Sequence, residues 1–121
     1  QWAETLTYED PLFGTAANFN TEVKAAYSDY ANKKVPYQLA QASAAVYVFK
    51  DAFERAGSLD KEALRDAIAA TDLETFYGGI KFSEAGNNIA KPMVLRQIQD
   101  GKYNVVAPSA FASHPINWPR N

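Results

Sequence analysis

The sequence predicts an α/β fold in which three helices are followed by a short strand and a β-hairpin. Up to Ala70, apolar side chains recur at the three-and-four spacing of amphipathic helices. Beyond Thr71, that spacing is replaced by glycines and alternating apolar residues, which indicate strands. An Asp100-Gly101 pair between two such runs is a strong signal for a two-residue hairpin turn.

The composition is that of a folded protein. Of the 121 residues, 47% are hydrophobic, 21% are charged and 13% are aromatic, which differs from the charge-rich composition of disordered chains. Twelve Lys and Arg against fourteen Asp and Glu leave a net charge of −2, so we expect no nucleic-acid partner. Cysteine is absent, which excludes disulfides and thiolate chemistry.

The first helix is expected from about residue 15 to 30, after an extended segment over residues 1–13 that enters a loop at Asp10-Pro11. Asn32 is expected to end this helix in the left-handed conformation. The expected buried face consists of Phe19, Val23, Ala26, Tyr27 and Tyr30.

The second helix is expected over residues 37–56, where Gly57 provides the stop. Its apolar face is wide and rich in alanine, so we expect the helix to be covered on more than one side. Asp60 is placed to cap a third helix that continues to about Ala70, and Leu59 and Leu64 fit a hydrophobic staple around that cap.

The β-structure is expected late in the chain. A short strand is predicted over residues 79–82 and a turn over 83–88, followed by hairpin strands at 93–99 and 102–107. Three helices with apolar faces thus have almost no sheet of their own to cover. Either they pack on each other as a small α+β domain, or they belong to a larger protein whose sheet is encoded elsewhere.

The catalytic inventory is thin. His114 is the only histidine, and no motif supports a nucleophile or a phosphate-binding loop. A small hydrolase that uses Tyr, Asp and His114 is therefore a weak alternative. Residues 83–88 offer oxygen ligands but lack the spacing of a calcium loop. We expect no enzymatic activity, no metal and no cofactor.

Aromatic residues are a better lead for ligand binding, although each suits a protein core equally well. They include Tyr8, Phe13, Tyr37, Tyr47, Tyr77 and Tyr103. At the start of the second helix, Tyr37, Gln38 and Gln41 cluster where free backbone N–H groups and the positive helix end can hold the polar part of a ligand. An ordinary hydrated first turn is the alternative interpretation.

Several segments resemble, in order, the C-terminal portion of a periplasmic solute-binding receptor of the branched-chain amino acid (Leu/Ile/Val) type, which serves ABC transporters. They are residues 8–14, 36–42, 56–60, 75–82 and 97–102. The resemblance implies a fragment of a two-lobed type I periplasmic binding protein, in which hinge strands join two α/β lobes over a ligand cleft. Residues 14–87 would then supply helices and a strand of the first lobe, residues 93–108 a hairpin of the second lobe, and residues 109–121 an irregular tail.

The resemblance also implies a site and partners. The start of the second helix would touch the ligand side chain, which makes Tyr37, Gln38 and Gln41 the expected ligand-binding residues and Gln41 the best of them. A polar Gln departs from the apolar surface expected for leucine, so an amide or an aromatic acid is a plausible ligand. The expected partners are the missing N-terminal part of the receptor and a membrane permease, in the periplasm, although the chain begins at Gln1 without a signal peptide. A ligand-sensing regulatory domain of the same fold is the alternative.

Overall fold

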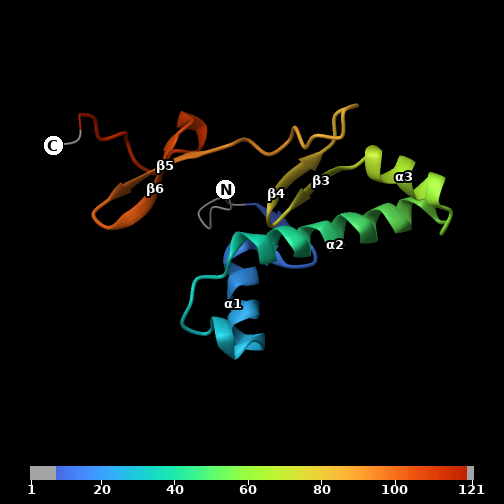
Figure 1. Ribbon diagram of the computed structural model, residues 1–121, viewed down its shortest axis with the longest axis horizontal. Coiled ribbons are helices and arrows are strands. Elements are labelled where there is room, and N and C mark those ends of the chain that lie inside the picture. The colour runs from blue at the N-terminus through green and yellow to red at the C-terminus, as the bar shows by residue number, and fades with distance from the viewer. Residues whose placement is uncertain (1–7, 120–121) are drawn as a thin grey trace. The chain divides into compact units, whose positions relative to one another are not determined.

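The computed structural model describes residues 8–119, so the start of the predicted extended segment and the last two tail residues lie outside the described part. The α/β mixture of three helices, short strands and hairpins is confirmed (Figure 1). The chain divides into two compact units, with the boundary between Lys91 and Pro92. The elements of the first unit are β1 (Glu9–Asp10), β2 (Gly14–Thr15), α1 (Ala16–Ala26), the 3-10 turn η1 (Ser28–Tyr30), α2 (Tyr37–Ala56), α3 (Lys61–Ala69), β3 (Asp72–Thr75) and β4 (Gly78–Lys81).

Helix α1 begins where predicted and ends four residues early. The Thr15 side chain caps it by accepting a hydrogen bond from the Asn18 backbone N–H at 3.2 Å. Tyr27 then takes an extended backbone conformation, and η1 replaces the expected last turn. The left-handed Asn32 is wrong, because Asp100 is the one described non-glycine residue with a positive φ. The chain instead leaves α1 through η1, whose 3-10 hydrogen bonds turn it without a left-handed residue.

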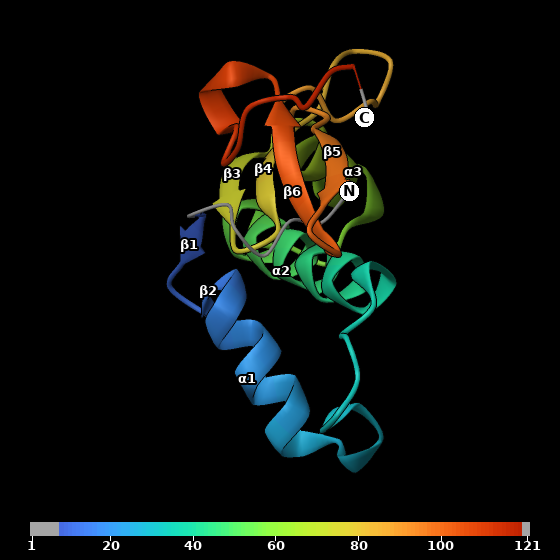
Figure 2. The same cartoon turned by 90° about the vertical axis from the view of Figure 1, so that its left-hand side faces the viewer.

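Helix α2 has the predicted bounds and ends at the left-handed Gly57. Its inner face is buried, and three of the five residues on that face are alanines, which let neighbouring backbone approach closely. This face consists of Ala40, Ala44, Tyr47, Val48 and Ala52. The β3–β4 hairpin lies along one side of the helix in both ribbon views (Figures 1 and 2).

A second apolar face of α2 is exposed. Its residues also follow the three-and-four helical spacing, so they form one stripe on the side opposite the buried face. We call this surface the outer stripe; it consists of Ala42, Ala45, Val46, Phe49 and Phe53. Val46 is 67% exposed and Phe49 49% exposed, so nothing within the described residues covers the stripe.

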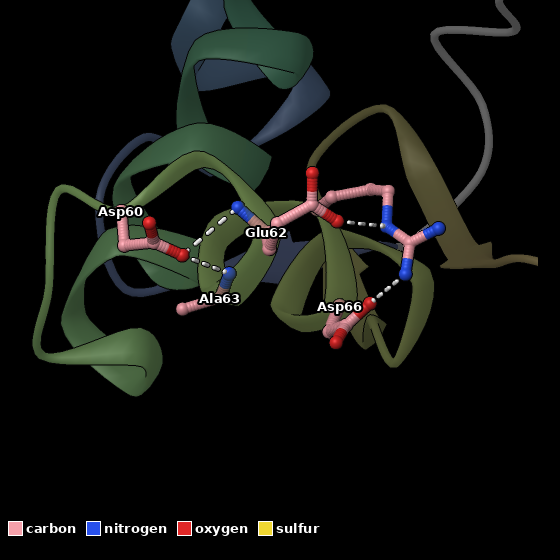
Figure 3. A network of polar contacts seen from close by, with 5 residues as sticks. Asp60, Glu62, Ala63 and Asp66 are labelled. Carbon is pink, nitrogen blue, oxygen red and sulfur yellow. Dashed lines mark hydrogen bonds and ion pairs between the residues drawn. The ribbon is translucent and has the colours of Figure 1, made fainter.

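Helix α3 begins as predicted at an Asp60 cap. The carboxylate of Asp60 accepts hydrogen bonds from the backbone N–H groups of Glu62 and Ala63, each at 3.0 Å (Figure 3). The predicted staple is wrong, because Leu59 is 88% exposed and does not pack on the helix. Without a neighbouring layer over this end, burying Leu59 would not remove enough apolar area from water to fix its position.

Strand β3 was not predicted from the sequence. This strand pairs antiparallel with β4 from Asp72 opposite Lys81 to Thr75 opposite Gly78, so a hairpin stands where one strand was expected. Two of the four β3 residues are acidic and exposed, which hides the strand from a search for alternating apolar residues. The ion pair between the Lys81 ammonium and the Asp72 carboxylate joins the open end of the hairpin.

Three phenylalanines form the centre of the core. The Phe19 and Phe76 rings stack with centroids 4.3 Å apart, and Phe13 packs edge-on against both, at 5.5 and 5.1 Å. The surrounding buried residues come from α1, α2, β4 and the loop before α2: Ala16, Val23, Val35, Ala40, Ala44, Val48 and Ile80. The helices therefore cover each other and the β3–β4 hairpin, with the outer stripe left over.

A buried carboxylate ties the start of the first unit to β3–β4. Asp10 is 4% exposed, and its Oδ1 accepts hydrogen bonds from the backbone N–H groups of Leu12 and Phe13 at 2.9 and 2.7 Å. Its Oδ2 accepts from the backbone N–H of Phe76 at 2.6 Å, across 66 residues of sequence. Asp10 thus places Phe13 and Phe76 side by side in the core.

The second unit contains the predicted hairpin, of β5 (Leu95–Gln99) and β6 (Lys102–Ala107), and a short 3-10 turn η2 (Ser109–Phe111). Asp100 and Gly101 both have positive φ, which is the geometry of a type I′ turn. β5 begins two residues later than expected, next to an irregularity in register at Leu95 and Arg96.

The described part of the tail is irregular, and two glutamine side chains hold it on the second unit. The Gln97 side chain donates to the Asn117 carbonyl and accepts from the Asn117 backbone N–H, both at 2.9 Å. The Gln99 side chain donates to the Pro115 carbonyl at 2.9 Å. These side-chain amides replace the backbone ladder of a third strand.

We expect Asp10→Ala to lower the free energy of unfolding by about 3 kcal/mol, because three backbone N–H groups, of which that of Phe76 is buried, lose a charged acceptor. Urea denaturation followed by circular dichroism measures the change. The neighbouring exposed Glu9→Ala is the matched control and is expected to shift stability by less than about 0.5 kcal/mol. Equal shifts in both variants would contradict this role for Asp10.

Candidate functional site

The turn between β3 and β4 presents Tyr77. The hydroxyl of Thr75, which is fully buried, accepts from the Tyr77 backbone N–H at 3.1 Å and donates to the Gly78 carbonyl at 2.8 Å. The Asp10 carboxylate holds the Phe76 backbone N–H in the same turn. The position of Tyr77 is therefore fixed by hydrogen bonds to its neighbours on both sides.

The segment after β4 returns along that strand. Asn88 accepts from the backbone N–H groups of Lys81 and Ala90 at 3.1 and 3.0 Å and donates to the Gly79 carbonyl at 3.0 Å. The Ile89 backbone N–H also donates to the Lys81 carbonyl at 2.8 Å. An added Cβ at Gly79 would lie 3.0 Å from the Ala90 carbonyl oxygen, so the close return favours glycine at this position.

The return brings Lys91 onto Tyr77. The Lys91 Nζ lies 2.9 Å from the centroid of the Tyr77 ring and is buried without a hydrogen-bond partner among residues 8–119. Its stem crosses Gly78, where an added Cβ would lie 3.2 Å from the Lys91 Cδ. Burial lowers the pKa of Lys91 to about 8, whereas the ring face favours the charged amine and opposes that shift.

Tyr37 lies beside Tyr77. Burial raises the pKa of the Tyr77 hydroxyl, and the negative charge that Tyr37 carries when it is ionised raises it further. Tyr37 is the first residue of α2 and is 47% exposed, and the preceding Pro36 provides no side-chain cap for the helix. We call these three residues the Tyr37–Tyr77–Lys91 cluster; it joins the start of α2, the β3–β4 turn and the return segment.

Gln38 and Gln41 are both exposed on the first turns of α2. Tyr37 and Gln41 are four residues apart and therefore share a face of the helix, whereas Gln38 projects about 100° away. Neither glutamine side chain hydrogen-bonds to a described residue, so their amides are available to a ligand. Of the three expected site residues, the fold joins Tyr37 to further polar groups and leaves the two glutamines in solvent.

Lys91 was not predicted from the sequence as a site residue, and Tyr77 was predicted only as one of several aromatic residues suited to a ligand or a core. A lysine between alanine and proline carries no pattern of its own. The available signal was the neighbouring pair Gly78-Gly79, because paired glycines in a strand mark a place where another segment approaches closely. The glycine pair indicates that another segment packs closely on β4, but it does not indicate that Lys91 belongs to that segment.

The described residues show no catalytic relay at His114. Its Nδ1 lies 3.1 Å from the Ser113 hydroxyl, and no carboxylate of the described chain orients the ring. Within residues 8–119, no three His, Cys, Asp or Glu side chains come together to hold a metal ion. The residues 83–88 form a turn closed by the Ser83 backbone N–H and the Asn87 carbonyl at 2.9 Å.

The candidate site offers aromatic surface, hydroxyls, an amine and side-chain amides, which suits the binding of a small molecule. The family model described as periplasmic binding protein matches residues 4–102, which include the whole cluster. The chain belongs to the periplasmic binding protein family. Membership supports a solute-binding role outside the cytoplasm in a family that is generally non-enzymatic.

No helix within residues 8–119 has both the length and the apolar character required to cross a bilayer.

We expect Lys91→Met to stabilise the protein at pH 7, because a buried charge is replaced by a neutral side chain of similar shape. The pKa of Lys91 is about 8 in the folded chain and 10.5 when unperturbed, so between these values the unfolded chain binds more protons. The free energy of unfolding of the wild type therefore rises with pH in this window, and its deficit against the variant closes.

Thermal denaturation of both proteins from pH 6 to pH 10.5 measures this difference. Lys102→Met, at an exposed position, is the control and is expected to show no such window. A gap between wild type and Lys91→Met that stays constant over the whole pH range would contradict the burial of a titrating amine.

Proposed function

We propose that this chain is part of the solute-binding receptor of an ABC transporter, which captures an amino acid or a related amide or acid between two hinged lobes. The observation that carries the proposal is the match of residues 4–102 to the periplasmic binding protein family. The Tyr37–Tyr77–Lys91 cluster supports it, because it gathers polar groups from three segments at one end of α2.

The proposed lobe assignment gives residues 14–87 to the first lobe, residues 93–108 to a hairpin of the second lobe and residues 109–121 to an irregular tail. The boundary between Lys91 and Pro92 is compatible with this assignment, because it separates the helices from the hairpin. The outer stripe of α2 supports it as well. An apolar helix face of this kind is stabilised when it covers a sheet, and in the proposal an upstream segment of the receptor provides that sheet.

The proposed ligand contacts come from Tyr37, Gln38 and Gln41, with Gln41 closest to the ligand side chain. Tyr37 and Gln41 share a helix face, so one ligand can touch both. Helix α2 also lacks a side-chain cap at its first turn. The Leu39 N–H donates to the Pro36 carbonyl at 3.1 Å, and the N–H groups of Tyr37 and Gln38 are available to an oxygen of the ligand. Residues of the missing segment would hold the α-amino and α-carboxylate groups.

The proposed ligand class is an amino acid of the branched-chain type, or an amide or aromatic acid of similar size. Gln41 favours the second group, because a side-chain amide left without a partner in a closed cleft would be unfavourable opposite leucine. In the proposed mechanism the ligand makes contacts with both lobes only in the closed state, and so stabilises that state. A membrane permease would then accept the ligand from the periplasm.

We expect Val46→Asp and Phe49→Asp to prevent association of this chain with the upstream segment of its receptor, because each places a charge on the outer stripe. Both side chains are exposed in this chain, so circular dichroism is expected to show unchanged helix content. Size-exclusion chromatography of the mixed segments measures association. Tyr27→Asp, at an exposed aromatic outside the stripe, is the control; the same loss there would contradict the assignment.

We expect Gln41→Ala to weaken ligand binding by the receptor that contains this chain about tenfold, because a hydrogen bond in the cleft is lost. Calorimetric titration with leucine, glutamine, a short aliphatic amide and phenylacetate measures binding. Glu54→Ala, at an exposed position in the last turns of α2, is the control. No binding of any of the four compounds would contradict the function, whereas binding that is insensitive to Gln41→Ala would contradict the site alone.

A further inference from the structure

A hollow of about 430 Å³ lies where the end of α1 meets the loop before α2. It is separate from the Tyr37–Tyr77–Lys91 cluster and shares no residue with it. Its volume is in the range of small-molecule pockets. The lining residues are Asn20, Lys24, Asn32, Lys33, Lys34 and Val35. Val35 is 1% exposed and gives the hollow a rigid, packed base.

The charge of the lining is entirely positive. Three of the six residues are lysines and none is acidic, in a chain whose net charge is −2. Lys24 and Lys33 form no ion pair with any described residue, so their ammonium groups have free donors. Like charges held around one hollow repel each other, and an anion that binds there removes the repulsion.

Lys24 is explained in part by its position in the last turn of α1, where a cation stabilises the negative helix end. Helix ends do not explain Lys33, which follows η1 in a loop. The acidic residues of the same elements, Glu22 and Asp29, are exposed and do not line the hollow. The hollow therefore presents a local positive field next to two side-chain amides.

Asn20 adds a second, independent feature. Its Oδ1 is sealed from solvent and has no hydrogen-bond donor within the described chain. A buried acceptor without a donor is unfavourable by about 1–3 kcal/mol. A ligand in the hollow reaches this atom when the Asn20 side chain turns toward it, and such a ligand must bring a hydrogen-bond donor as well as negative charge.

We propose that the hollow formed by Asn20, Lys24, Asn32 and Lys33 is a binding site for a phosphate group. A phosphate near neutral pH carries negative oxygens for the lysines and the Asn32 amide, and a protonated oxygen that can donate to Asn20 Oδ1. Sulfate has the same shape, and the same charge as the hydrogen-phosphate dianion, but no proton to donate at this pH. The proposal is independent of the ligand cleft proposed above.

Calorimetric titration of the full chain at pH 6.5 with inorganic phosphate and with sulfate tests the site. We expect phosphate to bind at one site and sulfate to bind at least fivefold more weakly. A third titration with glycerol phosphate distinguishes the source of the group: tighter binding than inorganic phosphate assigns the site to a phosphomonoester, and weaker binding assigns it to the free ion.

Lys24→Gln and Lys33→Gln are each expected to weaken phosphate binding about tenfold, because each removes a charge-assisted hydrogen bond. Both positions are exposed, so the fold is expected to persist, and circular dichroism checks it. Lys50→Gln is the control, because Lys50 pairs with Glu54 on α2 at 2.7 Å and does not line the hollow. Equal binding of sulfate, absence of phosphate binding, or an equal loss in Lys50→Gln would each overturn the proposal.

Discussion

The Asp10 carboxylate is the constraint on which the first unit depends. It accepts two hydrogen bonds from its own loop and one from the distant β3–β4 turn. One buried carboxylate therefore holds the backbone of both Phe13 and Phe76, whose rings meet in the core. The desolvation of the carboxylate is unfavourable, and the hydrogen bonds from three backbone N–H groups offset that penalty. Each of these N–H groups also gains an acceptor. The position of the core and the position of Tyr77 at the candidate site therefore have one cause.

Elements with local signals could be predicted from the sequence, whereas features made by distant contacts could not. The bounds of α2, the Asp60 cap and the Asp100-Gly101 turn each follow from a few neighbouring residues. Strand β3 was missed because its stability comes from pairing with β4 and from the burial of Thr75, while its own pattern is polar. Tyr37 was predicted as a site residue from its place at the start of a helix, but its place in a cluster with Tyr77 and Lys91 was not predicted. Lys91 reaches Tyr77 only because a return segment follows β4, and no local spacing encodes that path.

Helix α2 has two apolar faces, and they differ in kind. The inner face is rich in alanine, and the helix contacts α3 and β3, so this face is specific for close neighbours. The outer stripe carries larger side chains, Val46, Phe49 and Phe53, which remain exposed. Two apolar faces on one helix are typical of a helix that lies between two layers, which is the arrangement proposed for the receptor.

The contact between Gln97 and Asn117 uses only backbone atoms of the tail. The identity of the side chain at position 117 is therefore free to drift during evolution, with proline excluded because it lacks the N–H that Gln97 accepts. Position 97 has no such freedom, since glutamate would lose the donor and leucine would lose both partners. Selection on this contact therefore acts on Gln97, whose side chain binds the peptide group. Most substitutions at position 117 leave the contact unchanged.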